Sequence, residues 1–163
     1  MWWSEPRRVA IGLAALLLAG CGFHLQGALT LPEGVRSVHV STRDELTPFA
    51  VELRRALERS GAQVAPSSAG ADAVIRIRQD RTGRRVLSVS ARNTPQEFEV
   101  YYSVEFAIDR GGAETLAQQQ LDATRYFSFD ESLLLAKDRE EASLREAMAR
   151  DLADLVLRQL GSL

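Results

Sequence analysis

The sequence predicts an α/β fold, a two-layer sandwich in which two helices pack on a mixed sheet of about four strands. Apolar residues recur at helical spacing in residues 48–60 and 139–160, whereas from 73 to 129 apolar and polar residues alternate as they do in strands. A further strand is expected at 35–40, so the order is strand, helix, three strands, helix. The first strand–helix–strand unit predicts a parallel pair, and the later hairpins add antiparallel strands.

The first helix has clear start and stop signals. Thr47 stands at the N-cap position, Pro48 at the first helical position and Gly61 at the stop. Residues 62–71, rich in Ala, Ser, Pro and Gly, are expected to form a loop that returns the chain to the sheet. The predicted apolar stripe of this helix consists of Leu46, Phe49, Ala50, Leu53 and Leu57.

A period of two begins at Ala73, which predicts a strand with one face toward a core and the other toward water or a partner. Thr82 and Gly83 interrupt the pattern and predict a bulge or turn. The apolar positions, all odd-numbered, are Ile75, Ile77, Leu87, Val89 and Ala91. The polar positions, all even-numbered and expected on one shared face, are Arg76, Arg78, Arg84, Ser88, Ser90 and Arg92.

Residues 97–109 form the most regular predicted strand, because apolar or aromatic side chains alternate with polar ones along its whole length. The two glycines at 111–112 predict a hairpin into a third long strand at about 114–129. Carboxylates expected on the exposed, solvated face of the regular strand are Glu97, Glu99 and Glu105.

The last predicted helix runs from about 139 to 160. Asp138 is expected to cap it, acidic residues occupy its first turn, and Gly161 stops it. Its predicted apolar stripe consists of Leu144, Met148, Leu152, Leu155 and Val156.

The N-terminal residues indicate export. Arg7 and Arg8 precede an apolar run of about ten residues, the length of a secretory signal core and too short to cross a bilayer, which needs ~20. The tetrad that ends in Cys21, Leu-Ala-Gly-Cys, resembles a lipobox. We therefore expect residues 1–20 to be a signal peptide and Cys21 to be acylated, although an ordinary signal peptide with a chance cysteine is the alternative.

The expected lipid anchor sets the organisation of the rest of the chain. Residues 21–34 are interpreted as a lipidated tether and residues 35–163 as a single α/β domain. Several acyl chains would hold the protein on a membrane, whereas one binds only reversibly. Gly22 follows the cysteine where an aspartate resembles an inner-membrane retention signal, so we expect the periplasmic side of the outer membrane.

Charge and composition exclude several functions. The net charge of −2 argues against nucleic acid, although residues 76–92 hold six arginines against one acid, Asp80. Only two histidines exist, His24 and His39, so no zinc site or hydrolase triad is expected and no cofactor is indicated. His39 is interpreted as an ordinary strand residue. The sequence predicts binding or assembly rather than catalysis.

Two motifs resemble those of the lipopolysaccharide-assembly lipoproteins of the LptE family. One is Cys-Gly-Phe-His-Leu at residues 21–25, and the other is Leu-Ala-Lys-Asp at residues 135–138. The resemblance implies a plug and assembly subunit of the outer-membrane lipopolysaccharide translocon. The partners it implies are a large outer-membrane β-barrel, lipopolysaccharide, and the membrane through acyl chains. Two alternatives stay open: a pilotin-like or general barrel-assembly lipoprotein without lipopolysaccharide binding, and a peptidoglycan-binding lipoprotein.

Lipid A carries phosphates that guanidinium groups bind in a bidentate manner. We select Arg92, expected where a strand ends and a turn begins, and Lys137, which is the only lysine and belongs to a family-like motif. Arg84 and Arg85 are expected behind them. The alternative is that these residues are solvated or face the barrel wall.

Overall fold

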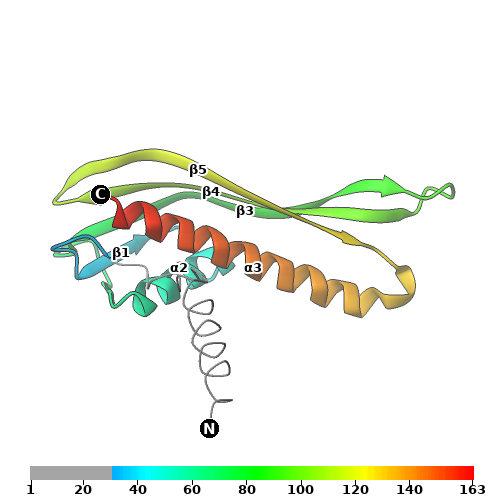
Figure 1. Ribbon diagram of the computed structural model, residues 1–163, viewed down its shortest axis with the longest axis horizontal. Coiled ribbons are helices and arrows are strands. Elements are labelled where there is room, and N and C mark those ends of the chain that lie inside the picture. The colour runs from blue at the N-terminus through cyan, green and yellow to red at the C-terminus, as the bar shows by residue number, and fades with distance from the viewer. Residues whose placement is uncertain (1–30) are drawn as a thin grey trace, which may run out of the picture.

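The computed structural model describes residues 31–163 and confirms the two-layer α/β fold, with five strands rather than about four (Figure 1). The elements in chain order are β1 Ser37–Ser41, α2 Pro48–Arg59, β2 Gln63–Val64, β3 Ala73–Val89, β4 Pro95–Arg110, β5 Ala113–Ser128, the 3-10 turn η1 Glu131–Leu133 and α3 Leu134–Gly161. The extra strand is β2, two residues of the segment predicted to be only a loop. A strand of two residues is too short to leave a periodic signal in the sequence.

The sheet is mixed, as predicted. Its order is β2-β1-β3-β4-β5, with β1 parallel to both β2 and β3 and with β3, β4 and β5 joined as antiparallel neighbours. β1 pairs with β3 only over residues 73–76, whereas β4 follows β3 along nearly its whole length. The long strands therefore run past the short ones and give the molecule its extended shape (Figure 1).

Both helices cover the same face of the sheet, and α3 runs along the long strands (Figure 1). The core lies between the layers and includes Leu53 of α2 and Leu152 of α3, both essentially inaccessible to water. The alternating apolar residues of β4 all point into it, as predicted. None of the helices formed by residues 31–163 combines the length and the apolar composition that a bilayer-spanning helix needs.

The start of α2 is fixed by the predicted cap. Thr47 Oγ1 accepts a hydrogen bond from the amide of Ala50 at 3.2 Å and donates one to Asp80 Oδ2 on β3 at 2.5 Å. The amide of Phe49 donates to the buried hydroxyl of Tyr102 on β4. These bonds tie the first turn of the helix to the sheet. Leu46, which was predicted in the apolar stripe, precedes the cap and is 85% exposed.

β3 does not keep one alternation along its length. Its register against β4 shifts between Ile77 and Gln79, which makes Arg78 an extra residue in the strand. Beyond this bulge the two faces exchange, so that Arg84 lies opposite the buried Val100 on the side of the helices. The prediction that the even-numbered residues Arg76, Arg78, Arg84 and Arg92 share one face is therefore wrong.

The half of β3 beyond Arg78 also differs from the prediction, because the inserted residue changes which side chains face the core. Thr82 and Gly83 pair regularly with β4 instead of forming a bulge or turn. Further irregularities follow Val86, and the residues expected in the core, Leu87 and Val89, are 48% and 51% exposed. A period of two predicts one face only as long as no residue is inserted.

α3 begins earlier than the sequence indicates. The helix starts at Leu134, so Asp138 lies inside it and is not its cap. A polar cap is found instead at the preceding 3-10 turn, η1, where Asp130 Oδ1 accepts a hydrogen bond from the amide of Ser132. Leu155, predicted in the apolar stripe, is 39% exposed. Buried apolar positions of α3 that were not predicted are Ala149, Ala153, Leu157 and Leu160.

Candidate functional site

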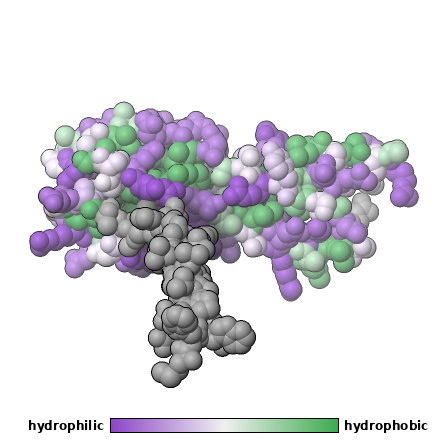
Figure 2. Space-filling view, viewed as in Figure 1, coloured by the Kyte–Doolittle hydropathy of each residue, from purple (hydrophilic) through white to green (hydrophobic). Residues whose placement is uncertain are grey.

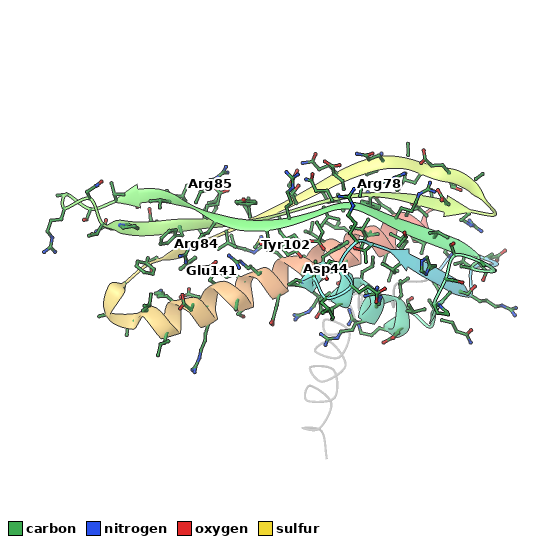
Figure 3. All side chains as sticks on the ribbon, turned by 180° about the vertical axis from the view of Figure 1, so that it is seen from behind. Asp44, Arg78, Arg84, Arg85, Tyr102 and Glu141 are labelled. Carbon is green, nitrogen blue, oxygen red and sulfur yellow. The ribbon has the colours of Figure 1, made fainter. Side chains whose placement is uncertain are left out.

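The structure places the four predicted cationic residues at one end of the molecule. We call this the distal end and define it as residues 84–99, the outer part of β3 and β4 with their turn, and residues 126–147, where β5 leads through η1 into α3. Figure 3 shows Arg84 and Arg85 on this part of β3, with Arg84 toward α3 and Arg85 on the opposite face of the sheet. The four side chains therefore do not form one row.

Arg92 lies in the turn between β3 and β4. The turn is closed by two backbone hydrogen bonds, from the Ser90 amide to the Thr94 carbonyl and from the Asn93 amide to the Ser90 carbonyl. The Ser90 hydroxyl accepts from the amides of Arg92 and Thr94. Asn93 adopts a positive φ of 60°, a conformation that asparagine tolerates better than most residues. Among residues 31–163 the exposed Arg92 side chain forms no ion pair, so its guanidinium is available to a ligand.

The Arg84 side chain makes its contacts between the sheet and α3. Its Nη1 donates to Oε2 of Glu141 on α3 at 2.6 Å, and its guanidinium lies 4.9 Å from the centre of the Phe98 ring, within cation–π range. Arg145, one turn further along α3, pairs with the other oxygen of Glu141. Burying a carboxylate is costly unless it is paired, and the buried Glu141 is paired twice.

Arg85 occupies the uncovered face of the sheet. Its Nη2 donates to Oε1 of Glu99 at 2.5 Å, and this contact raises the pKa of the Arg85 guanidinium above its ordinary value. Glu99 was predicted to be solvated, yet it is buried beneath its neighbours. Nearby, the ring of Tyr101 lies so close over Gly83 that a Cβ at that position would meet its hydroxyl at 2.5 Å. Glycine lets the tyrosine lie flat against the strand.

Lys137 is less free than the sequence suggested. Its side chain is only 15% exposed, and Nζ donates to Glu140 Oε2 at 2.8 Å within the helix. Hydrogen bonds from Ser132 hold the pKa of the Asp130 carboxyl below its ordinary value, and the charge of Lys137 lowers it further. Lys137 therefore helps to join η1 to the first turns of α3.

Apolar side chains are exposed around these cations. They come from the end of β3, from β5 and from the start of α3, and Leu135 is the most exposed of them at 77%. Figure 2 shows hydrophobic residues interspersed with hydrophilic ones over this part of the surface. Exposed apolar patches with a polar rim mark interaction sites. The exposed apolar residues are Val86, Leu87, Val89, Tyr126, Leu133, Leu134 and Leu135, with Val86 on the face toward the helices and Tyr126 on the opposite face.

Sequence reasoning missed Glu141, Arg145 and the burial of Glu99. The roles of Glu141 and Arg145 depend on the packing of α3 against β3, and the burial of Glu99 depends on the pairing of β4 with β3. His39, by contrast, is the structural residue that was expected, with Nδ1 2.9 Å from the carbonyl of Ala65. Cys21, the predicted acylation site, lies outside the described residues, and its acylation stays a prediction. Within 31–163 no group of His, Cys, Asp and Glu side chains is arranged to hold a metal ion.

The two-layer α/β fold and the cationic, partly apolar distal end are typical of a small binding module. The family model described as lipopolysaccharide-assembly, LptE, matches residues 35–160. The chain belongs to the LptE family.

Individual relatives agree with this assignment. The chain is 24% identical to the LPS-assembly lipoprotein LptE of Pectobacterium atrosepticum, over 93% of this chain and 83% of the relative. It is 27% identical to the protein of the same name from Photorhabdus laumondii, over 92% and 82%.

Solved structures show the same fold. Lipoprotein B of Nitrosomonas europaea matches with a TM-score of 0.71 at 29% identity, covering 86% of this chain and 91% of the other. The rare lipoprotein B of Shewanella oneidensis matches with a TM-score of 0.67 at 26% identity, covering 78% and 95%. The description of the family is one of assembly and does not mention catalysis.

Proposed function

We propose that this chain is an outer-membrane lipoprotein that assembles and plugs the barrel of the lipopolysaccharide translocon and takes part in lipopolysaccharide insertion at the cell surface. The observation that carries the proposal is the match of the LptE family model across residues 35–160, nearly the whole domain. Sequence relatives over more than 90% of the chain are named LPS-assembly lipoproteins, which supports the same function.

The proposed partners are the translocon barrel, lipopolysaccharide, and the membrane through acyl chains on Cys21, with the domain on the periplasmic side of the outer membrane. An anchor of this kind holds the domain at the membrane surface, where a short tether of residues 21–34 keeps it close to a membrane-embedded partner. The export signal and the lipobox-like tetrad support this location.

The proposed contact with lipopolysaccharide is at the distal end. Lipid A presents phosphates next to acyl chains, and the distal end presents cations next to exposed apolar side chains. Arg92 is the principal proposed phosphate ligand, because its guanidinium forms no ion pair within residues 31–163 and stands on a closed turn. Lys137 is the second proposed phosphate ligand, and in the structure its Nζ donates to Glu140. Arg84 and Arg85 are already paired with carboxylates, so they contribute positive potential behind the site.

The partner test is an affinity purification of the tagged full chain from detergent-solubilised membranes, followed by mass spectrometry and by detection of lipopolysaccharide. We expect one large β-barrel protein and lipopolysaccharide to copurify. Copurification of a secretion-system or general assembly barrel without lipopolysaccharide would contradict the proposal and support the pilotin-like alternative. Sedimentation of the full chain with purified cell-wall sacculi would support the peptidoglycan-binding alternative.

A further inference from the structure

A second cationic region lies near the middle of β3, apart from Arg84 and Arg85 along the strand (Figure 3). A pocket of about 300 Å³ lies there between residues 42–47, which follow β1, and residues 77–81 of β3. This is the segment that contains the bulge at Arg78. Bulges re-aim side chains and end strand pairing next to functional sites, and β1 pairs with β3 no further than Arg76.

Three arginines line the pocket. Arg43 comes from the loop after β1, Arg78 is the inserted residue of the bulge, and Arg81 lies three residues further on. All three side chains are exposed, and within residues 31–163 none of them forms an ion pair. Most other arginines of the sheet, such as Arg76, are paired with carboxylates.

The two acids of the pocket are already engaged elsewhere. Asp80 Oδ2 accepts the hydroxyl proton of Thr47 at 2.5 Å. Burial and the charge of Asp80 together raise the pKa of Tyr102 above its ordinary value. Asp44 Oδ1 accepts from the amide of Leu46 at 2.9 Å, within its own turn. Both carboxylates therefore stabilise the local fold. Within residues 31–163 the three guanidinium groups form no ion pair.

We propose that this pocket binds a phosphoryl group, held by the guanidinium groups of Arg43, Arg78 and Arg81. Planar guanidinium groups match phosphate oxygens in a bidentate manner, and charged hydrogen bonds of this kind are about twice as strong as neutral ones. The site is separate from Arg92 and Lys137, so the domain carries two phosphate-binding places. Lipopolysaccharide, an anionic phospholipid and inorganic phosphate all present this group.

The test uses the isotopically labelled full chain in a non-ionic detergent, with pyrophosphate as the probe and sodium chloride at equal ionic strength as the reference. We expect saturable amide shifts at residues 42–47 and 77–81, distinct from any shifts in the turn that carries Arg92. The double variant Arg78→Gln with Arg81→Gln should bind at least tenfold more weakly. Arg158→Gln, which removes an exposed arginine on α3 that forms no ion pair in the described part of the chain, should bind as the parent does.

Shifts that do not saturate, or a folded double variant that binds pyrophosphate as the parent does, would overturn the proposal. If the double variant loses its native amide spectrum, Arg43→Gln on the loop provides the same test without altering the strand. Arg92→Asp should leave pyrophosphate binding here unchanged, which separates this pocket from the distal end.

The source of the phosphoryl group is identified with the full chain carrying Cys21→Ala, which lacks the proposed acyl anchor. Its binding is measured to phosphatidylcholine vesicles that contain either phosphatidylglycerol or lipopolysaccharide. Loss of binding in the Arg78 and Arg81 double variant with one vesicle type alone names that lipid as the source. Equal loss with both types shows that the headgroup phosphate alone is recognised. Binding of pyrophosphate together with vesicle binding independent of both arginines assigns the pocket to a soluble phosphate.

Discussion

Arg84 of β3 donates through Nη1 to Oε2 of Glu141 on α3, at 2.6 Å, and this contact joins the two layers of the molecule at the distal end. Arg145 pairs with the same carboxylate, and Glu141 is buried beneath both guanidinium groups. The distal end contains few fully buried apolar residues compared with the region under α2. The three charges therefore fix how the outer part of the hairpin sits on the start of α3.

Replacing Glu141 should loosen this end. Glu141→Gln leaves two arginines without a counter-charge, and because both are partly exposed to water the expected loss is about 1–3 kcal/mol of unfolding free energy. Chemical denaturation measures it. Glu146→Gln, an exposed glutamate without an ion pair among residues 31–163, is the matched control on the same helix. Equal stability of the Glu141 variant and the control would show that the charge cluster does not hold the layers together.

The core should respond to truncation where the two layers meet. Leu53→Ala and Leu152→Ala each remove a fully buried side chain and should cost about 2–5 kcal/mol. Leu46→Ala should cost less than about 0.5 kcal/mol, because that side chain is mostly in water. Thermal melting compares the three variants. A melting temperature of Leu152→Ala equal to that of the parent would remove α3 from the core.

Asp72 should make the stability depend on acid. Its Oδ2 accepts from the amides of Arg36 and Ser37, each at 2.8 Å, and these bonds hold the pKa of the Asp72 carboxyl below its ordinary value of 3.8. A carboxyl whose pKa is lowered by folding stabilises the folded state above its unfolded pKa and loses that effect as the pH falls through its folded pKa. Asp72→Asn should therefore be less stable than the parent at pH 7.

The measurement for Asp72 is denaturation of parent and variant from pH 7 down to pH 2. The difference between them should shrink below the ordinary pKa of the carboxyl. Glu58→Gln on the exposed side of α2 serves as the control. A difference in unfolding free energy between Asp72→Asn and the parent that stays constant from pH 7 to pH 2 would show that Asp72 does not cause the acid dependence.

The proposed lipid anchor can be tested by replacing Cys21. Cys21→Ala should abolish incorporation of labelled palmitate and release the protein from the membrane, since no other cysteine exists in the chain. Incorporation by this variant would show that the acylation site has been assigned wrongly.

Local signals predicted the fold well. The cap at Thr47, the stop near Gly61, the alternation in β4 and the two amphipathic helices are all properties of neighbouring residues, and all are found in the structure. The order of these elements was then enough to predict a mixed sheet with a parallel β1–β3 pair.

The candidate site was predicted less well, because it depends on long-range register. One inserted residue, Arg78, exchanges the faces of β3, so Arg84 turns to the helices and Leu87 does not reach the core. The pairing of Glu141 with Arg84 joins residues 57 positions apart, and nothing in either segment identifies the partner. The motif around Lys137 and the turn at Arg92 were recognised by resemblance and turn chemistry, and the structure places both at the distal end.

Binding of lipopolysaccharide by variants of the distal end tests the proposed function most directly. The full chain in non-ionic detergent should bind lipopolysaccharide more weakly as salt rises, because charged contacts at the surface are screened. Arg92→Asp with Lys137→Gln should bind on the order of tenfold more weakly, since one or two charged hydrogen bonds are lost. Glutamine replaces Lys137 because an added negative charge beside Glu140 and Asp130 would disturb α3 itself.

The control is Arg158→Asp, a charge change on α3 away from the distal end. We expect the double variant to keep its circular dichroism and its copurification with the barrel while its binding of lipopolysaccharide is weakened. A folded double variant that binds lipopolysaccharide as tightly as Arg158→Asp and the parent would contradict the assignment of the distal end as the lipopolysaccharide site.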